Sequence, residues 1–171
     1  MNANMPATLV FRRMQLGDTE SVLALGKRGL TYVDLAAADP DPHDYTSLYL
    51  MSGLTYEEFD PIDPDSPLAM SFVVETGKKV IGFLLAYAHF VGIPIIKICV
   101  IHAIVVDSDF HGQGIGTQLL NQLQIKCKEE DIQIVRIPVR QHNAQLINYL
   151  KSLGFRQSNV VNFDKLTGGE S

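Results

Sequence analysis

The sequence predicts a mixed α/β fold in which a central, mostly antiparallel sheet of about six to seven strands is flanked by helices. Three observations favour this class. Consecutive strand-like segments between residues 71 and 106 are joined by short turns, which is typical of an antiparallel meander. A glycine-rich loop at residues 112–116 then leads straight into an amphipathic helical pattern. Strand and helix patterns alternate from there to Phe155, as they do in βαβ units.

The composition indicates one globular domain over residues 1–171, with a frayed tail at Thr167–Ser171. The chain has 171 residues, of which 46% are hydrophobic and 19% charged, so it can bury a substantial core. A net charge of −5 argues against nucleic acid as the main partner. The most apolar stretch, Val80–Val106, is interrupted by glycine, proline, lysine and histidine, which favours core strands over a membrane span.

The two cysteines, Cys99 and Cys127, have no partners at metal-ligand spacing. We therefore expect free thiols in a reducing compartment and no bound metal. The first residues lack the pattern of a signal peptide, and together these features predict a cytoplasmic protein.

Apolar periodicity and turn residues predict the individual elements. Strands are expected at Leu9–Met14, Ser71–Glu75, Val80–Phe90, Ile95–Val106, Ile132–Val139 and from Phe155 onward. Helices are expected after a cap at Asp18 or Thr19, at Thr46–Met51, after the glycine loop, and at Asn143–Leu153. The near-continuous apolar run at Ile132–Val139 predicts a central position in the sheet.

The segment Asp34–Ala69 is rich in acidic residues and proline and contains no lysine or arginine. One interpretation is a solvated surface excursion of variable structure. The other is a negatively charged wall that attracts a cationic substrate, because long loops in compact domains often carry function.

The glycine loop after the Ile95–Val106 strand is a device for holding a phosphate, since it leaves backbone N–H groups accessible beside a helix N-terminus. It is no P-loop, because Thr117 follows Gly116 without an intervening lysine. Gly112, Gly114 and Gly116 occupy every second position, which differs from the G-x-G-x-x-G fingerprint of dinucleotide-binding loops. That fingerprint also follows the strand of a βαβ unit, whereas the strand before this loop belongs to the expected meander.

The stretch His111-Gly112-Gln113-Gly114-Ile115-Gly116 resembles the (Q/R)-x-x-G-x-(G/A) signature of the GCN5-related N-acetyltransferase (GNAT) superfamily. Further matching features occur in the same order, at Ile104–Asp107, Leu119–Leu120, Asn143 and Leu153–Phe155. The resemblance covers roughly residues 95–155 and implies a GNAT-like fold that uses acetyl-CoA as co-substrate.

The resemblance also implies which residues bind the coenzyme. The loop residues that would hold its pyrophosphate are His111, Gly112, Gln113, Gly114, Ile115, Gly116 and Thr117. Backbone groups of Ile104, Val105 and Val106 would pair with the pantetheine arm like an added strand. Asn143 would contact the coenzyme from the next helix, and the alternative for this residue is a helix N-cap.

The sequence departs from the family pattern at two positions. His111 stands where a permanent cation or an amide is expected. Leu150 stands where many relatives carry a tyrosine proposed to protonate the departing thiolate, and Tyr149 is its neighbour. Successive side chains on a helix are rotated by about 100°, so Tyr149 need not reach the coenzyme sulfur as a tyrosine at position 150 would. Tyr149 is nevertheless a candidate for the general acid.

The attacking amine must lose a proton, and His102 is the first candidate for the base. Strand alternation predicts that it shares a face with Ile104 and Val106, which would place it beside the coenzyme. The alternative is a buried strand histidine with a satisfied hydrogen bond. Glu57 and Glu58 of the acidic segment are further candidates, whereas nothing distinguishes His142 from a surface histidine.

These features predict an acetyl-CoA-dependent N-acetyltransferase that acts on a primary amine by direct attack on the thioester. The acceptor would be a small molecule or a peptide or protein amine, and the acidic segment favours a cationic one. The alternative is a non-catalytic acetyl-CoA-binding regulatory domain. Only sixteen residues follow Phe155, so the sheet could end in an open edge, and we hypothesise a homodimer that covers it.

Overall fold

A computed structural model describes residues 8–33, 67–139 and 143–159 of the chain. The chain divides into two compact units, which are residues 1–39 with 45–138, and residues 40–44 with 139–171. The helix expected at Thr46–Met51, most of the acidic segment and the frayed tail lie outside the described residues. The single domain over 1–171 stays a prediction.

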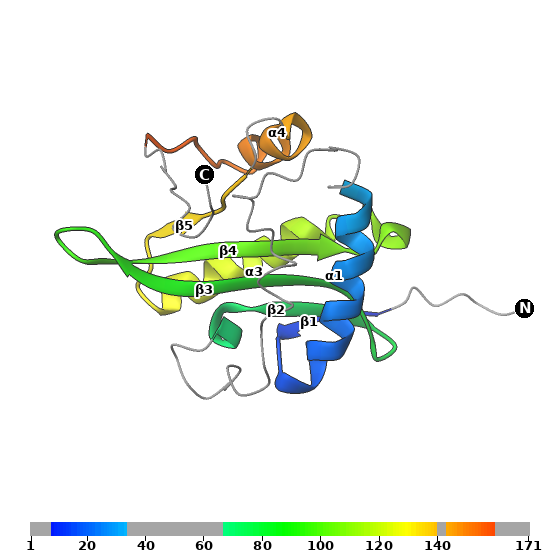
Figure 1. Ribbon diagram of the computed structural model, residues 1–171. Helices are drawn as coiled ribbons and strands as arrows, with labels where there is room; N and C mark the ends of the chain where they lie inside the picture. Colours follow the sequence, from blue (N-terminus) through cyan, green and yellow to red (C-terminus); the bar gives the residue numbers. More distant parts are fainter. Residues whose placement is uncertain (1–7, 34–66, 140–142, 160–171) are drawn as a thin grey trace, which may run out of the picture. The chain divides into compact units, whose positions relative to one another are not determined.

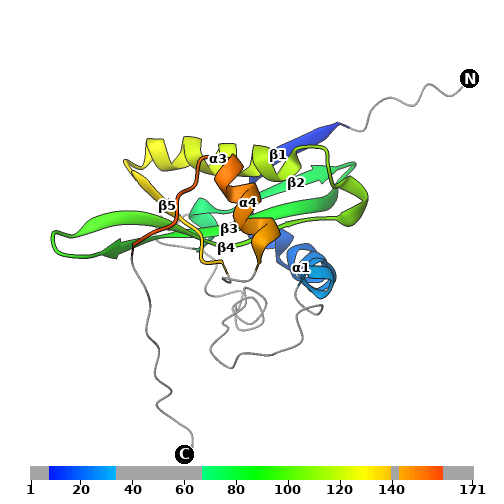
Figure 2. The same cartoon turned by 90° about the horizontal axis from the view of Figure 1, so that it is seen from above.

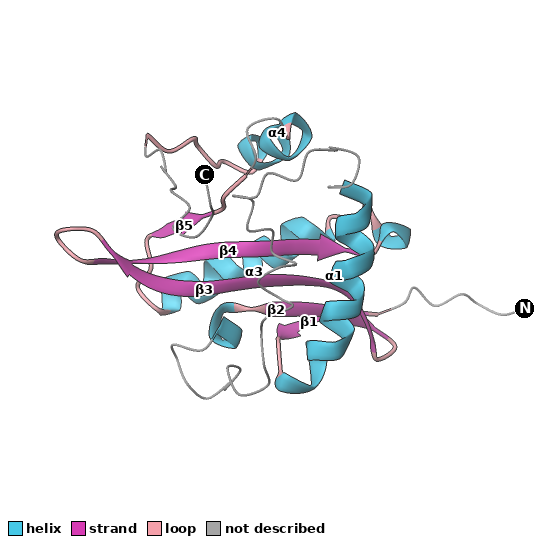
Figure 3. Ribbon diagram, in the orientation of Figure 1, coloured by secondary structure: helices cyan, strands magenta, loops and turns pink. Residues whose placement is uncertain are grey.

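The first unit contains a five-stranded sheet whose order follows the sequence (Figures 1 and 3). Its strands are β1 (Leu9–Arg13), β2 (Phe72–Thr76), β3 (Lys79–Val91), β4 (Ile96–Val106) and β5 (Ile134–Arg136). The first four pair antiparallel, and β5 pairs parallel with β4. The prediction of a mixed, mostly antiparallel sheet is therefore confirmed, with fewer strands than the six to seven expected.

The difference from the prediction lies at the C-terminal end. Residues 155–159 form no strand, while the rest of the expected last strand lies outside the described residues. The expected strand Ile132–Val139 is reduced to the three residues of β5. Among the described strands β5 lies at the sheet edge, and Ile134 is 42% exposed. The central position predicted for this strand stays a prediction, because residues 160–171 lie outside the described part of the chain.

Two long helices cover opposite faces of this sheet (Figure 2). α1 (Thr19–Val33) packs on β3 and β4, and α3 (Ile115–Glu129) packs on β2, β3 and β4. The buried side of α3 is formed by residues at helical spacing: Ile115, Leu119, Leu120, Leu123 and Cys127. The core beneath α1 comprises Met14, Val22, Leu25, Val73, Val80, Phe83, Leu85, Ala103 and Val105.

In the part of the chain that the structure describes, 3-10 helices connect these elements at Leu16–Asp18 (η1), Pro67–Met70 (η3) and Ser108–Phe110 (η4). The second unit contains α4 (Ala144–Ser152). No helix in the described ranges is long and apolar enough to cross a bilayer. Cys99 and Cys127 are free cysteines, as predicted, and both are buried.

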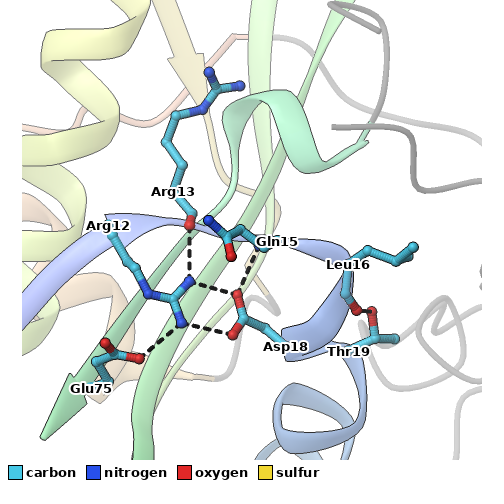
Figure 4. A network of polar contacts seen from close by, with 7 residues as sticks. All are labelled: Arg12, Arg13, Gln15, Leu16, Asp18, Thr19 and Glu75. Atoms are coloured by element: carbon cyan, nitrogen blue, oxygen red, sulfur yellow. Dashed lines mark hydrogen bonds and ion pairs between the residues drawn. The ribbon is translucent and has the colours of Figure 1, made fainter. Parts of the chain in front are cut away.

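An ion-pair network fixes the turn from β1 into α1 (Figure 4). The Arg12 guanidinium donates to both carboxylate oxygens of Asp18, at 2.8 Å each, and to Glu75 at 2.8 Å. Asp18 also accepts the Gln15 N–H at 2.8 Å. Burial alone would raise the pKa of Asp18, but the hydrogen bonds from Arg12 and Gln15 outweigh it and lower the pKa below its usual value.

Replacing Asp18 by asparagine should lower the free energy of unfolding at neutral pH by about 2 kcal/mol, because Arg12 loses its charged, bidentate partner. The folded-state pKa of Asp18 is lowered, so its stabilisation is complete above the unfolded-state pKa of about 3.9 and disappears as the pH falls through the folded-state pKa. Urea unfolding of the wild type and Asp18→Asn should therefore converge in acid. Glu75→Gln is the control, because it keeps the ion pair between Arg12 and Asp18. It should lower the free energy of unfolding by less than Asp18→Asn does, and an equal loss would contradict the central role of Asp18.

Candidate functional site

Strand β4 contains one extra residue, which divides it into two parts. Leu85 of β3 pairs with Ala103, and the next residue, Ala86, pairs with Ile101. His102 is therefore a β-bulge, a feature that bends a strand and disrupts its ladder. On its other side β4 pairs with β5 only at Ile98–Val100, before the bulge. Beyond it, no strand among the described residues pairs with that side of β4.

The main-chain groups of β4 beyond the bulge point alternately towards β3 and away from it. The Asp107 N–H donates to the Ile81 carbonyl at 2.8 Å, which fixes this alternation. Val105 therefore faces β3 and belongs to the ladder, whereas Ile104 and Val106 direct their N–H and C=O groups to the opposite side. Of the three residues expected to pair with pantetheine, two face the side without a described strand.

A compact turn leads from β4 into the glycine loop. Asp107 accepts the Asp109 N–H on its side chain at 3.3 Å and the Phe110 N–H on its carbonyl at 2.9 Å, which forms η4. Its carboxylate lies 3.4 Å from the Lys79 ammonium and 3.8 Å from the Arg28 guanidinium. Two cations from β3 and α1 thus meet at the start of the turn.

His111 ties the end of this turn back to β4. Its Nε2 lies 2.8 Å from the Val106 carbonyl oxygen, and because a carbonyl only accepts, the imidazole donates. The side chain that replaces the family's arginine or glutamine is exposed and engaged with the strand. The Val106 carbonyl is consequently occupied, and its N–H remains directed away from β3.

The glycines place the start of α3 beside this turn. Gly112 and Gly114 have φ values of +76° and +73°, the left-handed region that side chains rarely adopt. Gly114 is the N-cap of α3, and its carbonyl accepts the Gln118 N–H at 3.0 Å. Ile115, Gly116 and Thr117 form the first turn, whose N–H groups have no carbonyl within the helix to bond, and this turn carries no acidic residue. Gln113 is exposed between the two left-handed glycines.

Gly82 on β3 allows α3 to begin this close to the sheet. A Cβ at this position would lie 2.8 Å from Val74 Cγ1, 3.2 Å from the Val105 carbonyl oxygen and 3.6 Å from Ile115 Cγ2. Ile115 is the first residue of α3 and is 2% exposed, so its side chain anchors the helix N-terminus. Sequence reasoning missed Gly82, although an isolated glycine inside a strand is a known signal for close approach.

His102 lies on the face of the sheet that α1 covers. Its ring stacks on Tyr87 at 4.1 Å with an interplanar angle of 6°, and His89 meets the edge of Tyr87 at 4.1 Å. Tyr87 follows Phe83 and Leu85 at strand alternation, and both belong to the core beneath α1. Ile104 pairs with Leu84 and faces the other side. The predicted shared face of His102 and Ile104 is therefore wrong, because the bulge resets the alternation.

The environment of His102 keeps its imidazole neutral. Burial, with a smaller effect of the neighbouring His89, lowers the pKa of His102 to about 4. Its Nε2 is buried and has no hydrogen-bond partner in the described part of the chain. The expected satisfied hydrogen bond at this nitrogen is thus not found there. Burial also lowers the pKa of His89 and raises that of Tyr87.

Two candidate residues belong to the second unit. The Asn143 side chain accepts the Leu146 N–H at 3.1 Å and caps α4, so the N-cap interpretation is confirmed, while its coenzyme contact stays a prediction. Tyr149 is 37% exposed and its neighbour Leu150 is buried, as expected from their different positions around the helix. His142, Glu57 and Glu58 lie outside the described residues.

Comparison with known proteins agrees with this geometry. The sequence matches the acetyltransferase (GNAT) family over residues 35–155. An uncharacterized N-acetyltransferase of Methanocaldococcus jannaschii is 36% identical over 91 residues, which are 53% of this chain and 40% of that protein. The chain therefore spans less than half the length of this relative.

Solved structures share the fold at low sequence identity. A possible acetyltransferase from Clostridium difficile has a TM-score of 0.70 and 15% identity, with 94% of this chain and 99% of that chain covered. An aminoglycoside N-acetyltransferase in complex with CoA has a TM-score of 0.67 and 17% identity, with 97% and 99% covered.

The close approach at Gly82 makes a stability prediction. Gly82→Ala should lower the free energy of unfolding by about 1–3 kcal/mol, because the methyl group meets a side chain and a carbonyl oxygen in a packed region. Gly17→Ala is the matched control, since a Cβ there meets nothing within 4 Å. Urea titration of both variants measures their free energies of unfolding. Equal values for Gly82→Ala and Gly17→Ala would show that α3 can move away from the added methyl group without loss of stability.

Proposed function

The chain belongs to the acetyltransferase (GNAT) family, and we propose that it is an acetyl-CoA-dependent N-acetyltransferase that acts on a primary amine. The amine attacks the thioester carbonyl directly, forms the amide C–N bond and displaces the coenzyme A thiolate. One observation carries the proposal: Ile104 and Val106 direct main-chain groups away from β3 next to the α3 N-terminus.

The glycine loop and the first turn of α3 suit the diphosphate of acetyl-CoA. Backbone N–H groups and the helix dipole favour negative charge there, and no acidic side chain in the first turn opposes it. Residues 112–117, with His111 holding the loop to β4, would bind this part of the molecule. The outward N–H groups of β4 would hold the pantetheine arm and polarise the thioester carbonyl.

The proton of the attacking amine requires an acceptor. His102 is neutral above about pH 4 and has an unpartnered Nε2, so it can accept a proton without first losing one. It lies on the α1 face, so this role requires that the amine approaches from that face. Glu57 and Glu58 stay alternative bases, and Tyr149 stays a candidate donor to the thiolate.

A cationic amine is the acceptor that we propose. The acidic segment 34–69 provides a negative charge without a balancing lysine or arginine. A structural relative is an aminoglycoside acetyltransferase solved with a bisubstrate analogue of CoA and an acetylated neamine, with a TM-score of 0.67 and 18% identity. An aminoglycoside-like amine, a polyamine and a lysine or N-terminal peptide amine all carry this charge.

Calorimetry tests the coenzyme site. Acetyl-CoA should bind at micromolar concentration and NAD should not. Gly114→Ala should raise the dissociation constant by about 5- to 30-fold, because alanine in the left-handed region costs about 1–2 kcal/mol and displaces the loop. Gly17→Ala, outside the loop, should bind like the wild type. If Gly114→Ala bound acetyl-CoA with the same affinity as the wild type, the glycine loop would not be part of the coenzyme site.

A screen of amines with acetyl-CoA then separates catalysis from binding alone. Release of free thiol above the background hydrolysis rate with at least one cationic amine is the expected result, and mass spectrometry should find the acetylated amine. Tight binding of acetyl-CoA with no thiol release from any amine would favour the non-catalytic regulatory domain.

The pKa of His102 predicts the pH dependence of this reaction. If His102 accepts the proton, the rate should rise with pH around pH 4, and the titration of His102 should add no further pH dependence near neutrality, since the imidazole is already neutral there. His102→Ala should abolish that acidic limb, and His89→Ala should shift it slightly, because His89 adds to the lowering of the pKa. An acidic limb that persists in His102→Ala would assign the base to another group.

A further inference from the structure

The outer part of the β3–β4 hairpin extends beyond the rest of the sheet (Figure 1). The β2 ladder on β3 ends at Leu84, and the β5 ladder on β4 begins at Ile98. The two strands continue to pair with each other as far as Val91 and Ile96. This end of the hairpin is a two-stranded ribbon, and residues 84–96 contain no charged side chain other than the titratable His89.

Large apolar side chains on this ribbon are exposed. Phe90 is 68% exposed, Ile95 is 74% exposed, Ile96 is 43% exposed, and Ile93 in the turn is fully exposed. Single exposed apolar residues are ordinary, but four within seven consecutive positions gather at the tip of the ribbon, as at an interaction site. Phe90 pairs with Lys97 and Val91 with Ile96, so Phe90 and Ile96 lie on opposite faces of the ribbon.

The ribbon also has a main-chain edge that no described strand pairs with, although η3 contacts β3 before it. The Ser71 hydroxyl accepts from the Ala86 N–H at 3.1 Å and donates to the Ala86 carbonyl at 3.2 Å, so these groups point away from β4. By alternation Ala88 and Phe90 face the same edge, where no strand pairs with them in the described ranges. Natural proteins protect such edges with charges or bulges, and neither is found along residues 87–91.

We propose that a second copy of this chain covers this edge. Two β3 strands related by a twofold axis at His89 run antiparallel, so the N–H and C=O groups of Ala88 in one copy face those of Phe90 in the other. The exposed isoleucines of each turn pack against the partner's ribbon. Burying this patch and its backbone on both copies removes on the order of 1,000 Å² from solvent, the size at which specific interfaces begin.

Charge argues against a lipid bilayer as the occupant. Interfacial membrane segments usually carry lysine or arginine beside their apolar residues. Here residues 84–96 contain neither, the nearest cation, Lys97, pairs with Glu130 at 3.4 Å, and the whole chain carries a net charge of −5. A second copy brings an identical, uncharged edge.

The proposed interface is independent of the proposed function. The hairpin turn and the glycine loop lie at opposite ends of β4, about 30 Å apart along the strand. Pairing at the hairpin therefore leaves the loop open. It also uses a different edge from the C-terminal one that the sequence suggested for a homodimer.

Sedimentation velocity of the full chain over a concentration series from low to high micromolar tests the proposal. The wild type should sediment as a dimer. Ile93→Lys and Phe90→Lys should each raise the dimer dissociation constant roughly 30-fold or more, the effect of removing a central interface side chain. Ile125→Lys places the same charge on an equally apolar, 51% exposed position of α3 and should stay dimeric.

Ile93→Lys cannot perturb the core, because Ile93 is fully exposed, so it keeps the test valid if Phe90→Lys misfolds. Hydrogen exchange should show protection of the Phe90 amide that is lost on dilution. A monomeric wild type at the highest concentration, or a dimer that Ile93→Lys leaves unchanged, would overturn the proposal. A monomer that co-sediments with phosphatidylcholine vesicles through this patch would assign the surface to lipid instead.

Discussion

Each main-chain N–H and C=O group of a strand needs a hydrogen-bond partner, and β4 changes the partner on one of its sides halfway along its length. From Ile98 to Val100 it is held between β3 and β5. The extra residue at His102 bends the strand, and beyond it only the side facing β3 is paired within the described structure. The candidate site follows from this change, because Ile104 and Val106 then direct polar groups to a side that another extended chain can fill.

The position of α3 depends on the same part of the sheet. Gly82 is opposite Val106, and the missing side chain there lets Ile115 pack against β3. Gly114 in the left-handed region then turns the chain into the helix without a steric cost. A strand glycine and a loop glycine, thirty-two residues apart, therefore bring the α3 N-terminus beside the outward groups of β4.

Much of this arrangement follows from local patterns in the sequence. The amphipathic pattern after the glycine-rich stretch predicted α3, whose buried side is formed by residues at helical spacing. The face of His102 could not be predicted, because strand alternation holds only where no residue is inserted, and a bulge has no reliable composition. Likewise, the apolar run at Ile132–Val139 does not encode where β5 separates from β4, since that depends on the bend of its neighbour.

The same limit applies to His111, whose role depends on a contact rather than on residue type. As a hydrogen-bond donor it stabilises the turn through the Val106 carbonyl. Positive charge is present nearby, because Asp107 holds Lys79 and Arg28 within 4 Å of its carboxylate. Asp109 adds a second carboxylate to the same turn, so the two cations are balanced by two carboxylates there. The turn therefore gives an anionic ligand no net attraction. The backbone N–H groups of the loop and of α3 remain as the short-range donors for such a ligand, and their direction is fixed by Gly112, Gly114 and the tie from His111.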